Sequence, residues 1–102
     1  MHAAVVLAHP RADSYAHALA QRAINGLQIA GHRVDVIDLY ADGFRAAMSE
    51  AEWKAYPGDK PILDPLVQTS ADLVRNVDAL IFIYPTWWSG LPAILKGWME
   101  RV

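Results

Sequence analysis

The sequence contains no cysteine, which excludes disulfides, thiolate nucleophiles and cysteine-based zinc sites. It also lacks an excess of positive charge. A net charge of −2 and a pI of about 6.0 give no electrostatic basis for binding nucleic acid or an anionic membrane. No apolar run is long enough to span a bilayer, and no secretory leader precedes the first strand-like stretch. With 102 residues, 54% of them hydrophobic, we predict a single globular unit located in the cytoplasm.

Strand-like and helix-like stretches alternate along the chain. Local signals mark several helix ends: Gly31 suits a left-handed helix cap, Ser49 to Glu52 has capping-box spacing, and Asp64 followed by Pro65 is typical of a helix start. The expected strands are 3–8, 34–39 and 79–84, and the expected helices are 14–30, a short one from Ser49, 65–76, and one from Pro92 onward.

The order of these elements predicts an α/β fold with a doubly wound parallel sheet. Two strand arrangements compete. A dinucleotide-binding order needs a glycine-rich first turn, and residues 9–14 contain no glycine. We therefore expect the flavodoxin-like order 2-1-3, with the second strand at an outer position. The all-apolar third strand is expected to be covered on both faces.

The last helix pattern is still continuing at the final residue. Leu95, Trp98, Met99 and Val102 fall at helical spacing and are expected to form one buried face. No capping glycine, polar tail or further strand follows. We therefore expect residues 1–102 to be the amino-terminal part of a single longer domain, truncated after the third strand and the following helix.

The loop after the third strand carries two adjacent tryptophans, Trp87 and Trp88, followed by Ser89 and Gly90. In an open α/β sheet, such a loop lies at the carboxyl end of a strand, where ligands bind. Exposed flat side chains beside small residues favour a seat for a flat aromatic cofactor. The alternative is that both tryptophans belong to the core or to a dimer interface.

The loop after the first strand has features of a phosphate site. The following helix offers unpaired N–H groups at its start, Ser14 adds a hydroxyl, and Arg11 or a protonated His9 adds positive charge. Asp13 opposes an anion. The alternative is that Asp13 or Ser14 only caps the helix and Arg11 is solvated. Phosphate at this loop and a ring at the tryptophan loop together describe a flavin mononucleotide.

Other polar and aromatic residues carry no comparable signal. Trp98 shares a helical stripe with Leu95 and is assigned to packing, whereas Lys96 is expected to be solvated. His17 and His32 are expected at the surface. No cluster of His, Asp and Glu has metal-ligand spacing, and no Ser-His-Asp arrangement is readable, so neither a metal nor a catalytic acid–base residue is assigned.

Several motifs resemble one known family. These are Ala8-His9-Pro10 with Ser14, Asp38-Leu39-Tyr40, and residues 85–98. From Val5 to Val102 the chain resembles the NAD(P)H:quinone oxidoreductase family of flavodoxin-like flavoproteins. The resemblance implies that the first loop holds the flavin phosphate through His9, Ser14 and Tyr15, with Arg11 added on charge alone. It implies that the isoalloxazine ring lies on the second loop, at Pro85, Thr86, Trp87 and Trp88. Ser89 and Gly90 are added to this site because small residues let the backbone approach a ligand closely.

The same resemblance implies an activity and an assembly. Hydride would pass from NAD(P)H to the flavin and then to a quinone or similar acceptor, in a homodimer. We expect FMN, with FAD as the alternative. Three other functions remain open: a flavodoxin-type electron carrier, a regulatory ancillary subunit of a potassium-efflux system that uses residues 40–64 as its contact surface, and an inactive fragment. The physiological acceptor and the choice between NADH and NADPH cannot be read from the residues.

Overall fold

The computed structural model describes residues 1–102 and confirms the predicted alternation of strands and helices. Most boundaries fall within one residue of the predicted ones. The elements are β1 (His2–Leu7), α1 (Tyr15–Ile29), β2 (Arg33–Asp38), α2 (Glu50–Ala55), α3 (Pro65–Asn76), β3 (Ala79–Ile83) and α4 (Ala93–Arg101).

The strands form one parallel sheet in the order β2-β1-β3, as predicted for a flavodoxin-like fold. Val5 of β1 lies between Val36 of β2 and Ile81 of β3 in the register. Because β1 has a strand on each side and helices on both faces, every residue of 3–8 is buried. This position explains why the first strand is an unbroken apolar run.

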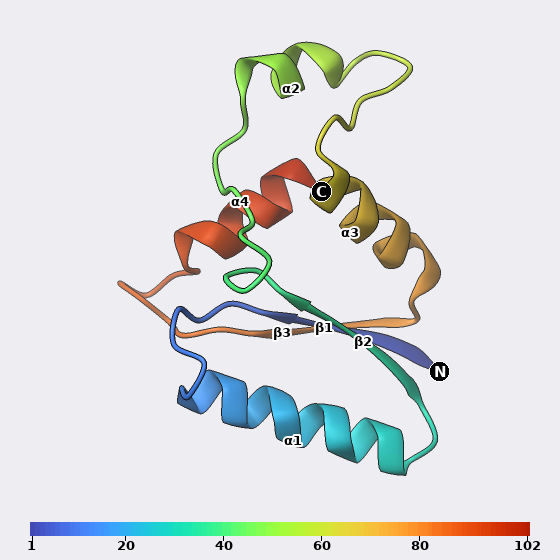
Figure 1. Cartoon of the computed structure of the whole chain (residues 1–102), viewed down its shortest axis with the longest axis vertical. Coiled ribbons are helices and arrows are strands. Elements are labelled where there is room, and N and C mark those ends of the chain that lie inside the picture. The colour runs from blue at the N-terminus through green and yellow to red at the C-terminus, as the bar shows by residue number, and fades with distance from the viewer.

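Helices cover both faces of the sheet (Figure 1). On one face, Val5 and Leu7 pack with Ala16 and Ala20 of α1. On the other face lie α3 and α4, and α2 is the helix farthest from the sheet. The core on that second face consists of Val6, Ala8, Ile37, Leu39, Phe44, Val67, Leu95 and Trp98.

The exposure of β3 differs from the prediction. Its residues are partly exposed, and Leu80 is exposed, although the strand is apolar throughout. The reason is its place at the edge of the sheet, where only β1 pairs with it. The apolar sequence therefore predicted that this segment is a strand of the sheet. It did not predict that the side chains of this strand are partly exposed.

The predicted helix caps are confirmed in atomic detail. Ser14 accepts a hydrogen bond from the His17 backbone N–H at 3.2 Å, and Asp64 accepts one from Leu66 at 2.9 Å. Ser49 and Glu52 form a reciprocal capping box that starts α2. One prediction is corrected: Pro92 is the residue before α4 rather than its first helical residue, since its backbone is extended.

The buried face of α4 also needs correction. Met99, predicted to be buried, is exposed, while Trp98 is buried as expected. On α4 the buried face instead includes Arg101, whose side chain has no exposed surface. The guanidinium lies over the Phe44 ring, 5.0 Å from its centroid.

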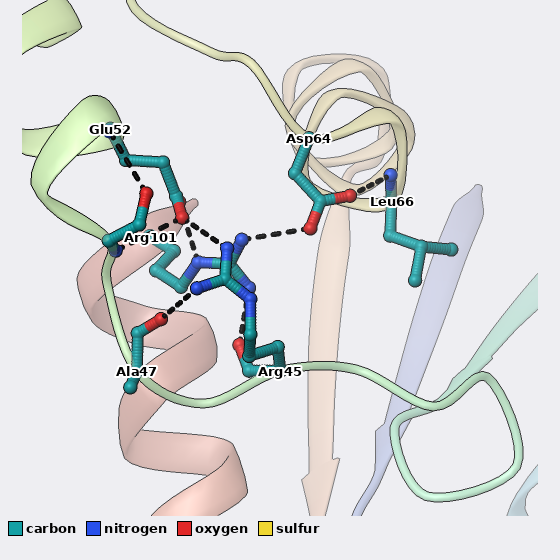
Figure 2. A network of polar contacts seen from close by, with 7 residues as sticks. Arg45, Ala47, Glu52, Asp64, Leu66 and Arg101 are labelled. Atoms are coloured by element: carbon teal, nitrogen blue, oxygen red, sulfur yellow. Dashed lines mark hydrogen bonds and ion pairs between the residues drawn. The ribbon is translucent and has the colours of Figure 1, made fainter.

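Arg101 is the centre of a polar network that holds residues 45–64 against the domain (Figure 2). Its Nε donates to Glu52 of α2 at 2.7 Å and its Nη2 donates to Asp64 at 2.9 Å. A third nitrogen, Nη1, donates to the backbone carbonyl of Arg45. The Arg45 side chain donates in turn to Glu52 at 2.5 Å.

These contacts change the ionisation of the network. The hydrogen bond from Arg101 lowers the pKa of Glu52 from 4.5 to about 2, and the same guanidinium lowers the pKa of Asp64. Burial acts to lower the pKa of Arg101, but the hydrogen bonds to the two carboxylates outweigh it and raise that pKa. All three groups are therefore charged at neutral pH, so the buried cation is compensated.

None of the helices has both the length and the apolar character that crossing a bilayer would require.

Candidate functional site

Two loops leave neighbouring strands at the same end of the sheet (Figure 1). The first follows β1 and the second follows β3, and a backbone hydrogen bond from Ala8 to Ile83 at 3.0 Å joins their bases. The rings of His9 and Trp87 meet edge to face, with centroids 6.2 Å apart. The structure therefore brings together the two loops that the sequence singled out.

The first loop presents hydrogen-bond donors at the start of α1. The backbone N–H groups of Tyr15 and Ala16 donate no hydrogen bond within the chain. They add to the positive end of the helix dipole. Ser14 caps the helix beside them, and His9 Nδ1 accepts the Arg11 N–H at 3.0 Å, which fixes the orientation of the imidazole. The group of donors suits an oxyanion such as phosphate.

Arg11 is not free to meet an anion in this structure. Its guanidinium makes two hydrogen bonds to the Asp13 carboxylate, at 3.0 and 2.8 Å, and both side chains are exposed. This pairing lowers the pKa of Asp13. The pair contributes no net charge, so the positive charge predicted for this loop is offset by the carboxylate that follows it.

The second loop contains a tight turn at residues 87–90. Trp87 and Gly90 exchange backbone hydrogen bonds at 3.2 and 3.1 Å. The two central residues, Trp88 and Ser89, have φ angles of 51° and 61°. This left-handed conformation favours glycine or asparagine, so tryptophan and serine here store strain on the order of 1 kcal/mol each. Strain of this kind is common at ligand sites.

This turn leaves three backbone donors unused. The Trp87 N–H is taken by Gly90, but those of Thr86, Trp88 and Ser89 donate no hydrogen bond within the chain. The turn also holds the Trp88 side chain completely in solvent, and Trp87 is exposed. The alternative assignment of both tryptophans to the core is therefore wrong for this chain.

A small cavity of about 200 Å³ contains residues from both loops. It is lined by His9, Tyr15, Ala16, Leu19, Tyr84 and Pro85. A larger groove of about 640 Å³ lies between β2 and α3 and contains none of the predicted site residues. Tyr15 and Ala16, whose backbone N–H groups are unused, line the smaller cavity.

His17 is not the surface residue that the sequence suggested. Its imidazole is largely buried and lies between Ser14 and Asp38, with Nδ1 2.8 Å from Ser14 Oγ and Nε2 3.4 Å from Asp38 Oδ2. This Ser-His-Asp arrangement is not readable in the sequence because Asp38 is distant along the chain. A local signal existed: Ser14 and His17 are one helical turn apart, at a spacing that brings side chains together.

A sequence profile of the family described as flavodoxin-like fold matches residues 1–102, the whole chain. The chain belongs to this flavodoxin-like fold family. Among solved structures, the flavodoxin-like chain is similar to an NAD(P)H:quinone oxidoreductase from Methanothermobacter marburgensis, with a TM-score of 0.86 and 37% identity over 99% of this chain. It is also similar to a putative quinone reductase from Klebsiella pneumoniae, with a TM-score of 0.89 and 30% identity.

Among curated proteins, the flavodoxin-like chain is 36% identical to NAD(P)H dehydrogenase [quinone] 1 of Cavia porcellus over 98% of its length. The chain spans only part of these relatives. It covers 42% of the Cavia protein, 52% of the Methanothermobacter chain and 44% of the Klebsiella chain. The similarity therefore bears on the part of the relatives that contains the two loops.

Proposed function

We propose that this chain is the amino-terminal part of a flavin-dependent NAD(P)H:quinone oxidoreductase. The observation that carries the proposal is the convergence of unused backbone donors from two loops beside an exposed tryptophan pair. Relatives named as NAD(P)H:quinone oxidoreductases support it, since they match nearly the full length of the chain.

The residues present fit a flavin. The N–H groups of Tyr15 and Ala16 with the Ser14 hydroxyl would hold the phosphate, because an anion is favoured at the positive end of a helix. The free N–H groups of Thr86 and Trp88 would bind the polar edge of the ring. We favour FMN over FAD because no residue of these loops is assigned to an adenine.

A bound flavin would supply the redox chemistry, taking hydride from NAD(P)H and giving it to a quinone or a similar acceptor. The chain would supply binding and orientation, and no acid–base residue is needed for hydride transfer. Trp87 and Trp88 would limit the access of water to the ring on one side. Amide donors at the ring edge would favour the more negative, reduced form.

The proposal includes a homodimer and a cytoplasmic location, both carried by the resemblance. Trp53 in α2 and Tyr56 directly after it are exposed. They support an interface, because large apolar side chains rarely gather on a monomer surface without a partner.

Flavin titration of matched tryptophan variants tests the cofactor site. Trp88→Ala is expected to weaken FMN binding by roughly tenfold, because base-like rings lose about 1–3 kcal/mol when a stacking aromatic is removed. Trp53→Ala is the control, since Trp53 is also exposed, at 69%, but lies on α2 away from the two loops. FMN fluorescence quenching measures affinity, and circular dichroism confirms that both variants are folded.

Equal affinity in the two variants would contradict the assignment of the loop. Trp98→Ala gives a second comparison, because Trp98 is buried and donates to Ser70 at 3.1 Å. This change is expected to cost about 3–5 kcal/mol of stability without removing a flavin contact. For the complete flavin-loaded protein, oxidation of NADPH by a soluble quinone is expected, whereas a flavodoxin-type carrier would show none without a reductase.

A further inference from the structure

Ser14, His17 and Asp38 form a row of polar groups, of which the proposed function assigns a role to Ser14 alone. Ser14 is the N-cap of α1, His17 lies in its first turn, and Asp38 ends β2. The imidazole joins the other two, with distances of 2.8 Å to Ser14 Oγ and 3.4 Å to Asp38 Oδ2. Its side chain is 19% exposed, so its partners are set by the fold.

The row determines where the proton of the Ser14 hydroxyl points when His17 is neutral. The negative charge of Asp38, 3.4 Å from Nε2, favours the tautomer with the proton on Nε2, because an N–H facing a carboxylate is attracted to it and a lone pair is repelled. Nδ1 then has a lone pair, and the Ser14 hydroxyl must donate inward to it. The remaining contact of Ser14 Oγ is the His17 backbone N–H, which it accepts. The neutral row therefore turns a lone pair, not a proton, toward an outside anion.

Protonation of His17 reverses this arrangement. Both ring nitrogens then carry a proton: Nδ1 donates to Ser14 Oγ, and the Nε2 proton faces the Asp38 carboxylate. The hydroxyl proton of Ser14 is released from its inward bond and can point outward, beside the free N–H groups of Tyr15 and Ala16. The site acquires one more donor and one more positive charge nearby.

We propose that His17 is a positioning residue that sets the direction of the Ser14 hydroxyl, so that the first loop binds the flavin phosphate more tightly when His17 is protonated. The proposal rests on the proposed function, because it deepens the role of the same phosphate site. Binding of the anion is then linked to the uptake of one proton by this row.

Other charged groups near His17 do not duplicate this effect. Asp38 is the only carboxylate within ion-pair distance of the ring. The imidazole of His9 lies edge to face with that of His17, with centroids 6.3 Å apart, and it has no contact with Ser14 Oγ. The remaining charged groups are Asp13 with its partner Arg11, on the same loop, and Asp42, close to Asp38.

Binding of FAD as a function of pH tests the proposal. FAD is the suitable probe because the phosphate monoester of FMN itself takes up a proton near about pH 6, whereas a pyrophosphate diester does not. We expect roughly tenfold tighter FAD binding at about pH 5.5 than at about pH 8, the range in which histidine changes its charge. Calorimetry in two buffers of different ionisation enthalpy is expected to show proton uptake on binding.

Two variants separate this mechanism from simple attraction by a positive charge. His17→Gln is expected to remove both the pH dependence and the proton uptake. Ser14→Ala is expected to remove most of the pH dependence although His17 remains, whereas attraction through space would leave it intact. His32→Gln is the matched histidine control, because His32 contacts the amino terminus and lies outside both loops, and its affinity is expected to keep the pH dependence of the unchanged chain. FAD affinity that responds to pH equally in the unchanged chain and His17→Gln overturns the proposal.

Failure of the flavin site itself is recognised separately. No binding of FMN or FAD at any pH contradicts the proposed function. Long-range nitrogen–proton NMR of His17 then decides the inference without a ligand. We expect the neutral ring to have its proton on Nε2, and Ser14→Ala to shift the Nδ1 resonance. A proton on Nδ1, or an unchanged Nδ1 resonance, overturns the proposal.

Discussion

The buried side chain of Arg101 connects α4 to three other positions in the chain. Its guanidinium is buried, yet it reaches two carboxylates and a backbone carbonyl that lie far apart in the sequence. An uncompensated buried charge would cost several kcal/mol, so each carboxylate is needed. The pKa of Glu52, lowered to about 2 by Arg101, reflects this dependence.

The Glu52 contact predicts a loss of stability in acid. A carboxylate whose folded-state pKa is depressed stabilises the fold above its unfolded value and loses that contribution as pH falls. We expect the free energy of unfolding to decline between about pH 4.5 and about 2, because that is the range between the two pKa values of Glu52. Urea denaturation across this range measures the decline.

The variant Glu52→Gln is expected to cost about 3 kcal/mol at neutral pH and to reduce the acid decline. Glu50→Gln is its matched control on the same helix. Glu50 pairs with Lys54 at 2.6 Å, but both side chains are exposed, so the expected cost is below about 0.5 kcal/mol. Equal effects of the two changes would show that the Glu52 contact contributes nothing specific.

The residues that the sequence did not reveal share one property. Arg101 and Glu52 are far apart along the chain, as are His17 and Asp38. Such pairs are created by the packing of distant elements, and no local pattern marks them. Ser14 was identified because its capping role depends only on its neighbours.

At the scale of elements, α4 lies unusually close to the chain segment at residues 45–47. Gly97 permits this approach, since an added Cβ would lie 2.5 Å from Ala46 Cα and 2.7 Å from its carbonyl carbon. These are backbone atoms, so a side chain could not be accommodated by a rotamer change. Gly97 therefore determines how closely α4 can approach residues 45–47.

Alanine scanning of two helix glycines tests this packing. Gly97→Ala is expected to destabilise the fold by about 2 kcal/mol or more, because overpacking against backbone forces α4 away. Gly26→Ala in α1 is the control, since nothing lies within 4 Å of its added Cβ. That change is expected to stabilise the fold by about 0.5–1 kcal/mol through helix propensity. Thermal unfolding of both variants gives the comparison, and a stable Gly97→Ala would refute the close packing.

The elements themselves were largely predictable because their signals are local. Ser49 with Glu52 and Asp64 with Pro65 mark helix starts by their spacing alone. The exposure of β3 was not predictable, since its apolar sequence fits both a covered strand and an edge strand. Met99 is exposed although its spacing predicted burial, and Arg101 is buried because it pairs with carboxylates that come from other parts of the chain.

For the whole molecule, the main asymmetry is between the two edges of the sheet. β2 and β3 are both edge strands, but β3 is more apolar and includes the exposed Leu80. An apolar edge with free backbone groups is prone to pair with another chain. This property is a hazard for the chain in isolation.

Concentration-dependent self-association through β3 is the expected consequence. Leu80→Lys is expected to reduce it, because a charge at an edge strand opposes pairing. Leu63→Lys is the control, since Leu63 is an exposed leucine in the loop before α3. Sedimentation velocity at increasing concentration measures the difference. Identical association in the two variants would mean that β3 does not form the contact.

The position of Arg101 has one more consequence. It ends α4, and the tryptophan turn precedes the other end of this nine-residue helix, about 14 Å away. The contacts of Arg101 with Glu52 and Asp64 therefore help to fix the position of the helix that follows the tryptophan turn.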